Sequence, residues 1–220
     1  MPLISENRDI VTQGLENIKN GVCCKAIKTL IDISSIREIT ASSLAFGLAP
    51  RVNASGRMGD AFSALKMFLS NDDSEIKELA LHLAECNVKR QVACEELYDI
   101  VKEMLKTTGN YGNVIVLAGK TWNNGILGIV SARITEEYNL PTILFSSSGD
   151  SLHGSARSID GINIFEAISS CKDYLIDFGG HAQAAGVTID KSNVEAFATK
   201  LNEYIKTTYS DVVFEKVLEV

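Results

Sequence analysis

Two short stretches in the second half of the chain carry the side chains best suited to hold phosphate. The first is Ser155-Ala-Arg157, and the second is Phe178-Gly-Gly-His-Ala-Gln-Ala-Ala-Gly186. Arginine presents a rigid fork of donors that fits phosphate oxygens, and glycines allow backbone N–H groups to approach an anion. The two stretches together indicate an anion-binding site, whereas each alone would be unspecific.

The first stretch belongs to a predicted strand over residues 152–158. His153, Ser155 and Arg157 alternate in it, so their imidazole, hydroxyl and guanidinium groups point to one face of the strand. The small residues between them point to the other face and favour close packing there. An edge strand with a solvated polar face would show the same pattern, so both interpretations stay open.

The second stretch places Gly179 and Gly180 directly before His181. Two consecutive glycines permit positive φ angles and expose their N–H groups, which a bound anion could use. A tight turn with an ordinary surface histidine is the alternative. The small residues of 182–186 favour a backbone that packs against a ligand.

Two further loops contain candidate contacts. Residues 51–60 are predicted to be a loop that carries Asn53 and Arg57, and Asp60 can cap a helix over 61–69. Trp122 and Asn123 precede a predicted helix, whose first turn could attract an anion. A solvated arginine in the first loop, and a capping asparagine beside a packed tryptophan in the second, are the alternatives.

The composition narrows the class of protein. The chain has 220 residues, 45% of them hydrophobic and 22% charged, which is typical of a globular protein. Its formal net charge of −7 argues against nucleic-acid binding through a generally basic surface, so any polyanion must be bound by a few local cations.

The sequence shows no metal-binding or membrane pattern. The five cysteines form no Cys-x-x-Cys pair, the three histidines are scattered, and no carboxylate pair stands out as acid and base. No apolar run approaches the roughly 20 residues of a membrane span, and the amino terminus does not have the pattern of a signal peptide. We therefore expect a cytoplasmic protein without a metal of its own in this stretch; the sequence does not indicate an oligomeric state.

The elements that position these residues fall into two unlike halves. Residues 1–70 are predicted to form short helices, the third of them capped by Thr40 and ended by Pro50. Residues 74–106 have a helical apolar period that a polar stretch around Asn87 and Arg90 interrupts, which is typical of a long helix joining two bodies.

The second half alternates strands and helices. We predict strands at 114–118, 142–145, 152–158 and 187–189, with helices at 126–138, 164–171 and 194–204. Buried apolar strands alternating with helices predict an α/β fold with a mixed, partly parallel sheet. The whole chain is thus expected to comprise a helical N-terminal segment, a long linking helix and a compact α/β domain.

The ordered set of motifs resembles the RecJ-type single-stranded-DNA-specific exonucleases of the DHH phosphoesterase superfamily, over about residues 2–190. The motifs are Asn53-Ala-Ser-Gly-Arg57, Asn87-x-x-Arg90-Gln91, Trp122-x-x-Gly125-Ile-Leu-Gly128, Gly154-Ser-Ala-Arg-Ser158 and Phe178-Gly-Gly-His-Ala-x-Ala-Ala-Gly186. Two positions depart from the family pattern. Asn123 stands where a histidine is usual, and Ala156 stands where a glycine is usual.

The resemblance implies a division of the chain. Residues 1–70 would be the end of the catalytic lobe, 71–108 the linking helix and 109–220 the DHH-associated substrate-binding domain. The Asp-His-His motif that binds two metals, Mn²⁺ or Mg²⁺, is not in this sequence. The chain would then be an excised part of a longer enzyme, close to inactive alone and with no metal bound to it.

The resemblance also implies residue roles. Arg57 would hold phosphate, Ser155 and Arg157 would bind the phosphate near the 5′ end, and Gly180 with the catalytic candidate His181 would contact the scissile or adjacent phosphate. The further substrate-contacting candidates are Asn53, Trp122, Asn123, Ser158 and Gly179. The implied activity is 5′→3′ digestion of single-stranded DNA in repair and recombination.

Two other functions remain open. The chain could belong to a phosphodiesterase of the same superfamily that acts on short oligonucleotides or cyclic dinucleotides. It could also be a module that binds nucleic acid or a protein partner without catalysis.

Overall fold

The chain folds into two compact units, Met1–Val92 and Ala93–Val220. The computed structural model describes residues 4–109, 111–212 and 214. The long helix α6 (Asp73–Thr108) contributes residues to both units. The three-part division at residues 70 and 108 stays a prediction.

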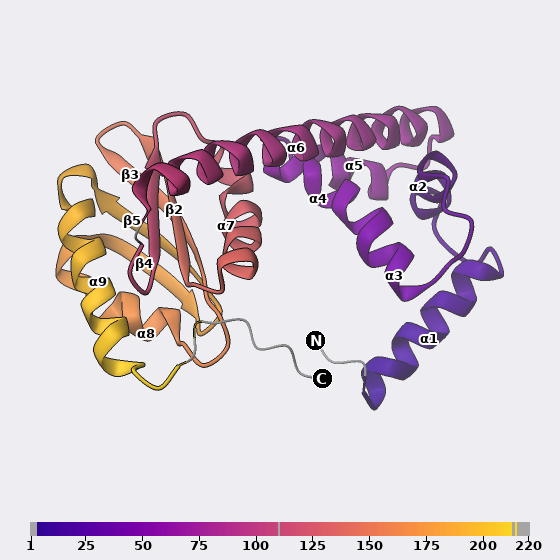
Figure 1. Ribbon diagram of the computed structural model, residues 1–220. Helices are drawn as coiled ribbons and strands as arrows, with labels where there is room; N and C mark the ends of the chain where they lie inside the picture. The colour runs from indigo at the N-terminus through magenta and orange to yellow at the C-terminus, as the bar shows by residue number, and fades with distance from the viewer. Residues whose placement is uncertain (1–3, 110, 213, 215–220) are drawn as a thin grey trace. The chain divides into compact units, whose positions relative to one another are not determined.

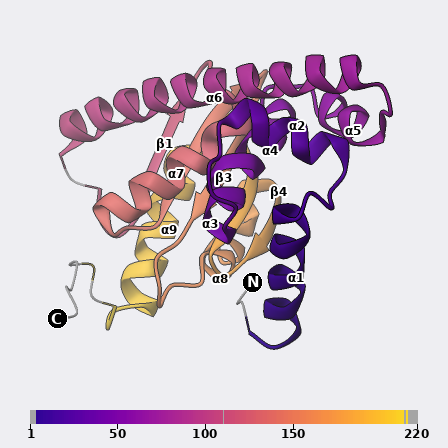
Figure 2. The same cartoon turned by 90° about the vertical axis from the view of Figure 1, so that its right-hand side faces the viewer.

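The first unit is helical, and no strand occurs within residues 4–109. Its core is formed by Leu30, Met67, Ile76 and Leu83, all almost fully buried. Figure 2 shows α2, α4 and α5 beneath the part of α6 that belongs to this unit. The helices are α1 (Glu6–Lys19), α2 (Lys25–Ser34), α3 (Ala41–Ser43), a π-helical turn η1 (Leu44–Leu48), α4 (Ala49–Arg57) and α5 (Phe62–Leu69).

The prediction of a loop over residues 51–60 was wrong, and so was the prediction that Pro50 ends the third helix. The helix that Thr40 caps passes through η1 into α4, and Pro50 lies in the first turn of α4. Pro50 follows directly on the π-helical turn, in which Ala49 N donates to the carbonyl oxygen of Leu44, so the regular helical bonding is already interrupted where the proline lacks an N–H. The chain leaves the helix only after Arg57. Asp60 then caps the next helix by accepting a bond from Ser63 N at 3.2 Å.

Helix α6 confirms the predicted long helix and is 36 residues in length. Its apolar stripe enters the core of the first unit through Ile76 and Leu83, and that of the second through Leu97 and Val101. Between them the predicted polar stretch is partly buried. Asn87 is only 6% exposed, so this stretch does not simply face solvent.

The second unit is built on a five-stranded sheet of order β1-β2-β3-β5-β4. β1 and β2 are parallel, and all other neighbouring strands are antiparallel, which confirms the predicted mixed sheet. The strands are β1 (Ile115–Gly119), β2 (Thr142–Ser148), β3 (Ser151–Arg157), β4 (Leu175–His181) and β5 (Ala184–Asp190).

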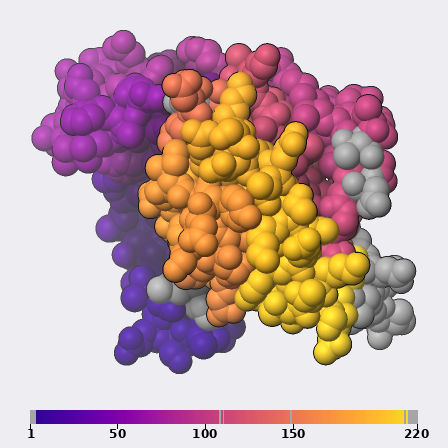
Figure 3. Space-filling model, turned by 90° about the vertical axis from the view of Figure 1, so that its left-hand side faces the viewer, coloured from indigo at the N-terminus to yellow at the C-terminus, as the bar shows by residue number. Residues whose placement is uncertain are grey.

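Helices cover the two faces of this sheet unequally. Helix α7 (Asn124–Tyr138) packs on one face, against β2 and β3, while α8 (Ile164–Ser169) and α9 (Val194–Thr208) lie on the other, as Figure 1 shows. The outer surface of the α8 and α9 layer is seen in orange and yellow in Figure 3. Short 3₁₀ turns, η2 (Lys172–Tyr174) and η3 (Lys191–Asn193), precede β4 and α9.

Strand β4 was not predicted from the sequence, because the two glycines of Gly179-Gly180-His181 do not favour a strand. The three residues instead form the end of an edge strand, paired with Gly186, Ala185 and Ala184 of β5. The turn follows them at residues 182 and 183. Pairing with β5 keeps the two glycines in the strand, and this contact between distant segments cannot be read from local residue preferences.

Candidate nucleic-acid interface

The predicted phosphate-binding residues of the second unit lie on one face of the sheet. In the register of β3, β5 and β4, Arg157 is opposite Ala184, which is opposite His181. Directly opposed residues on neighbouring strands point to the same face. Two strand spacings separate Arg157 and His181, about 10 Å. We call this face, on the same side as α7, the α7-side face.

The next rows along the strands extend the α7-side face. Ser155 is opposite Gly186, which is opposite Gly179, and beyond them His153 is opposite Thr188. Gly179, Gly186 and His181 are exposed, whereas Ser155 and Arg157 are partly covered. The face therefore has a polar border at β3, a floor of bare backbone at its centre and a histidine at the edge strand.

The guanidinium of Arg157 is held close to its own strand. Its Nη1 donates to Ser155 Oγ at 3.0 Å and to the carbonyl oxygen of Ala156 at 2.7 Å. An arginine in fixed contact with a hydroxyl is preorganised to share an anion with it. Ala156 itself is fully buried on the opposite face, so its departure from the family pattern lies away from this pair.

His181 has a defined hydrogen-bond partner. The backbone N–H of Gln183 donates to His181 Nδ1 at 3.3 Å, so the neutral ring carries its proton on Nε2. Nε2–H is then available to donate to an oxygen of a ligand. The turn is also tied to β3, because Ser158 N donates to the carbonyl oxygen of Gln183 at 3.0 Å. That bond fixes the ends of β3 and β4 that carry Arg157 and His181.

The glycines of this region differ in what they are needed for. A Cβ on Gly180 would lie 2.3 Å from the carbonyl oxygen of Ala184, so internal packing requires a glycine there. Nothing lies within 4 Å of a Cβ on Gly179, and only a carbonyl oxygen at 4.0 Å approaches one on Gly186. A glycine in a strand that packing does not require is typical of a surface that another molecule approaches closely.

The other predicted residues of the second unit have structural partners. Asn123 caps α7 by accepting a bond from Gly125 N at 2.8 Å. Trp122 packs its indole over Gly119, where a Cβ would lie 2.1 Å from the ring. Ser158 Oγ donates to the carbonyl oxygen of Ile162 at 2.8 Å. The roles predicted for these three residues in binding DNA remain predictions.

Asn53 and Arg57 belong to the first unit and lie on α4 rather than in a loop. Both are exposed and are one helical turn apart, so they share a face of that helix. Arg57 is in the last turn, where the helix dipole favours a cation. The two residues thus form a small polar pair of their own on α4.

Three residues that shape the α7-side face were not among the individual site residues predicted from the sequence, although Gly186 belongs to the predicted small-residue stretch. They are Gly186 in its floor, Thr188, whose Oγ1 lies 3.1 Å from His153 Nδ1, and Gly128 of α7, which touches the Ser155 and Arg157 pair. The strand period around Val187 and Ile189 could have assigned Gly186 and Thr188 to one face. Nothing in the sequence indicates which residue of α7 meets β3.

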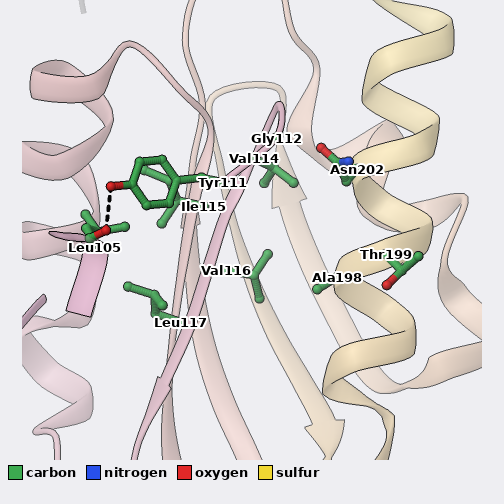
Figure 4. Close-up of a pocket in the computed structure, with 10 residues that line it drawn as sticks. All are labelled: Leu105, Tyr111, Gly112, Val114, Ile115, Val116, Leu117, Ala198, Thr199 and Asn202. Atoms are coloured by element: carbon green, nitrogen blue, oxygen red, sulfur yellow. Dashed lines mark hydrogen bonds between the residues drawn. The ribbon is translucent and has the colours of Figure 1, made fainter. Parts of the chain in front are cut away.

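Pockets border both this face and a separate region. Asn124, Leu127, His153 and Ser155 line an open pocket where α7 begins beside β3. A different pocket lies along the edge strand β1 and helix α9 (Figure 4), where Tyr111 donates a hydrogen bond to the carbonyl oxygen of Leu105 at 2.6 Å. Its lining includes none of the predicted residues, so we place the candidate site at the α7-side face.

Within residues 4–109, 111–212 and 214, no three His, Cys, Asp or Glu side chains are grouped so that they could hold a metal ion. The residues of this stretch therefore do not fit the two-metal centre that the resemblance implies.

Burial raises the pKa of the Cys171 thiol, which keeps it protonated and unreactive. In the same described ranges, no helix is long and apolar enough to cross a membrane.

Comparisons with known proteins agree on one family. Residues 111–207 match the DHHA1 domain. The chain is 37% identical to the single-stranded-DNA-specific exonuclease RecJ of Bacillus subtilis, an alignment covering 100% of this chain and 28% of that protein. It is 32% identical to the exonuclease of the same name from Salmonella typhimurium, covering 93% of this chain and 37% of that protein.

Solved structures give the same result. The crystal structure of RecJ in complex with Mg²⁺ from Thermus thermophilus matches with a TM-score of 0.85 and 30% identity, covering 94% of this chain and 32% of that one. A crystal structure of exonuclease RecJ bound to manganese matches with a TM-score of 0.79 and 29% identity, covering 97% of this chain and 54% of that one. The chain thus spans only part of the length of these relatives. It belongs to the RecJ-type proteins of the DHH phosphoesterase superfamily, and residues 111–207 are its DHHA1 domain.

Proposed function

We propose that this chain is the substrate-binding part of a single-stranded-DNA exonuclease that works from the 5′ end in repair and recombination. The α7-side face would bind the sugar–phosphate backbone of the strand, with Arg157 and Ser155 on the phosphate at or near the 5′ end. The relatives are single-stranded-DNA-specific exonucleases by name, which supports this substrate class.

The placement of Arg157 and His181 carries this proposal. They come from strands that are not neighbours, yet they share a face and a row, with only Ala184 between them. A guanidinium fork and an Nε2–H donor about 10 Å apart across a sheet can contact a phosphate each. The bare floor at Gly179 and Gly186 leaves room for the nucleotide that joins those phosphates.

The chemistry of the whole protein would need groups beyond this stretch. Divalent metals, Mg²⁺ or Mn²⁺ as in the related structures, would activate the attacking water and would be held by residues outside residues 1–220. Within the stretch, Arg157 would neutralise phosphate charge, and His181 would donate a hydrogen bond to a phosphate oxygen and help to orient the strand. Alone, it would bind single-stranded DNA without cutting it.

The first unit would provide a second contact. Arg57 and Asn53 lie on an exposed face of α4 and can donate hydrogen bonds to phosphate oxygens. The contacts proposed for Gly180, Trp122, Asn123 and Ser158 would be made through backbone groups or would position the loops around the face.

The first experiment measures binding of a 5′-phosphorylated single-stranded 12-mer by fluorescence anisotropy. We expect Arg157→Ala to weaken binding by about 1.5–3 kcal/mol, because a charge-assisted hydrogen bond is lost. Lys200→Ala is the matched control: Lys200 is exposed on α9, on the other side of the sheet, and its loss removes the same charge. Equal weakening by both variants would mean that only general charge matters and would overturn the site.

Two further arms separate the alternatives. Competition with a dinucleotide tests for a short-substrate enzyme, because a strand bound along the face should be displaced poorly by two nucleotides. Incubation of the chain with Mn²⁺ and the 12-mer tests for hydrolysis, and we expect none. Tighter binding of the dinucleotide than of the 12-mer would favour the short-substrate alternative instead.

A further inference from the structure

Gly128 lies in the second turn of α7, directly over the proposed phosphate-binding pair. A Cβ at this position would lie 2.4 Å from Arg157 Nη2, 2.9 Å from Ser155 Oγ and 3.1 Å from Arg157 Cζ. The first two distances are shorter than non-bonded atoms tolerate, and the third is tight. The guanidinium therefore occupies the space that any other residue at 128 would fill with its side chain.

The backbone gives no other reason for glycine here. Gly128 is inside a regular 15-residue helix, and it is not among the glycines with a positive φ. Glycine in the interior of a helix costs about 1 kcal/mol relative to alanine. The atoms that an alanine would meet are the ends of two movable side chains rather than backbone, so the fold itself could accept it.

We infer that Gly128 is a positioning residue for Arg157, which rests on the proposed function of that arginine. The missing side chain lets the guanidinium lie between α7 and β3, where Nη1 reaches Ser155 Oγ at 3.0 Å. An alanine at 128 pushes the guanidinium and the hydroxyl apart and turns the donor fork away from the anion that the two share. The geometry of a bidentate donor matters as much as its charge, so the charge that remains does not compensate.

The test compares four forms of the full 220-residue chain: wild type, Gly128→Ala, Arg157→Ala and the double variant. Each is measured for binding of the 5′-phosphorylated 12-mer and for its melting temperature. We expect Gly128→Ala to melt at the wild-type temperature or above it, and to bind about fivefold to twentyfold more weakly. In the Arg157→Ala background the same change should cause no further loss, because the residue that it displaces is already gone.

Gly14→Ala is the matched control. Gly14 lies inside α1, and nothing is within 4 Å of a Cβ there, so this change should stabilise the helix and leave binding unaltered. Wild-type affinity for Gly128→Ala would overturn the inference. So would a loss from Gly128→Ala that is equally large with and without Arg157.

A second readout does not depend on DNA. The NMR signal of the Arg157 Nε–H group, assigned by its absence in Arg157→Ala, should shift in Gly128→Ala and stay in place in Gly14→Ala. If no form of the protein binds the 12-mer, the proposed function fails, and the shift alone then decides whether Gly128 positions the arginine. An unshifted signal would overturn the positioning role whatever the binding result.

Discussion

The two faces of the sheet in the second unit use the same strands for different purposes. On the α8 and α9 side, β2, β3 and β5 present Phe145, Ala156 and Ile189, all fully buried. On the α7 side, β3, β5 and β4 present Ser155, Arg157, Gly186 and His181, which are exposed or only partly covered. Along β3 and β5 the residues of one face alternate with those of the other.

The difference implies that stability and DNA binding depend on different residues of the same strands. Two neighbouring residues of a strand point in opposite directions, so a change at one position affects packing against α8 and α9, and a change at the next affects the α7-side face. If the comparison holds, variants on the packed face should lower the melting temperature and keep the affinity. Variants on the α7-side face should lower the affinity and leave the melting temperature unchanged.

The largest expected effect is on the packed face. Phe145 is fully buried and meets Phe197 edge to face, with ring centroids 6.2 Å apart. Phe145→Ala should lower the free energy of unfolding by about 3–5 kcal/mol, because it leaves a cavity in the core. Urea unfolding measures the loss. Binding measured at a temperature where the variant stays folded should match wild type, and lost binding with an unchanged unfolding midpoint would break the comparison.

A smaller effect, on the affinity for the 12-mer, is expected on the α7-side face. Gly186→Val places a branched side chain on the floor between Ser155 and Gly179. Valine favours strands, so the melting temperature should not fall. Affinity for the 12-mer should fall about tenfold, equivalent to about 1.4 kcal/mol, because the strand can no longer approach the backbone. Unchanged affinity would show that the nucleotide does not lie on this floor.

The smallest expected effect concerns a carboxylate of α7 that is hydrogen-bonded to α6, away from both faces of the sheet. Glu137 accepts hydrogen bonds from Lys102 and from the hydroxyl of Tyr98, and the bond from Lys102 is the main cause that lowers the pKa of its carboxyl group. A lowered pKa means that the carboxylate stabilises the fold above its unfolded pKa, and that this contribution disappears as the pH falls through the lower folded pKa.

Glu137→Gln should therefore reduce stability at pH 7 by about 0.3–1 kcal/mol, as is usual for a partly exposed ion pair. Melting curves at several pH values test this. The difference from wild type should shrink in acid, and DNA binding should not change. A difference that persists unchanged at about pH 3, below the ordinary pKa of a glutamate, would show that the carboxylate charge is not its source.

Most of the helices and strands could be predicted because their apolar residues repeat with a clear period. The 36-residue α6 and the buried strand β2 are examples, since each is long or apolar enough for its period to decide. The alternation in β3 also placed His153, Ser155 and Arg157 on one face. That part of the candidate site follows from local geometry alone.

The rest depends on contacts between segments distant in sequence. β4 becomes a strand only because β5 pairs with it, since its two glycines have no strand preference of their own. The continuation of the helix into α4 depends on a π-helical turn that precedes Pro50, which no residue pattern announces. The role of Gly128 requires knowing which residue of α7 crosses β3, and this is a property of the packed layers.

The position of β4 at the margin of the sheet has a consequence for its motion. It has only one neighbouring strand, β5, so the amide groups along its outer side have no ladder partner among the strands of the described residues. Such margins open locally more often than the centre of a sheet, and their amide protons exchange faster with solvent. A bound strand of DNA that contacts His181 would slow this exchange, so the deuterium uptake of residues 175–181 becomes a direct gauge of occupancy in the absence of any catalysis.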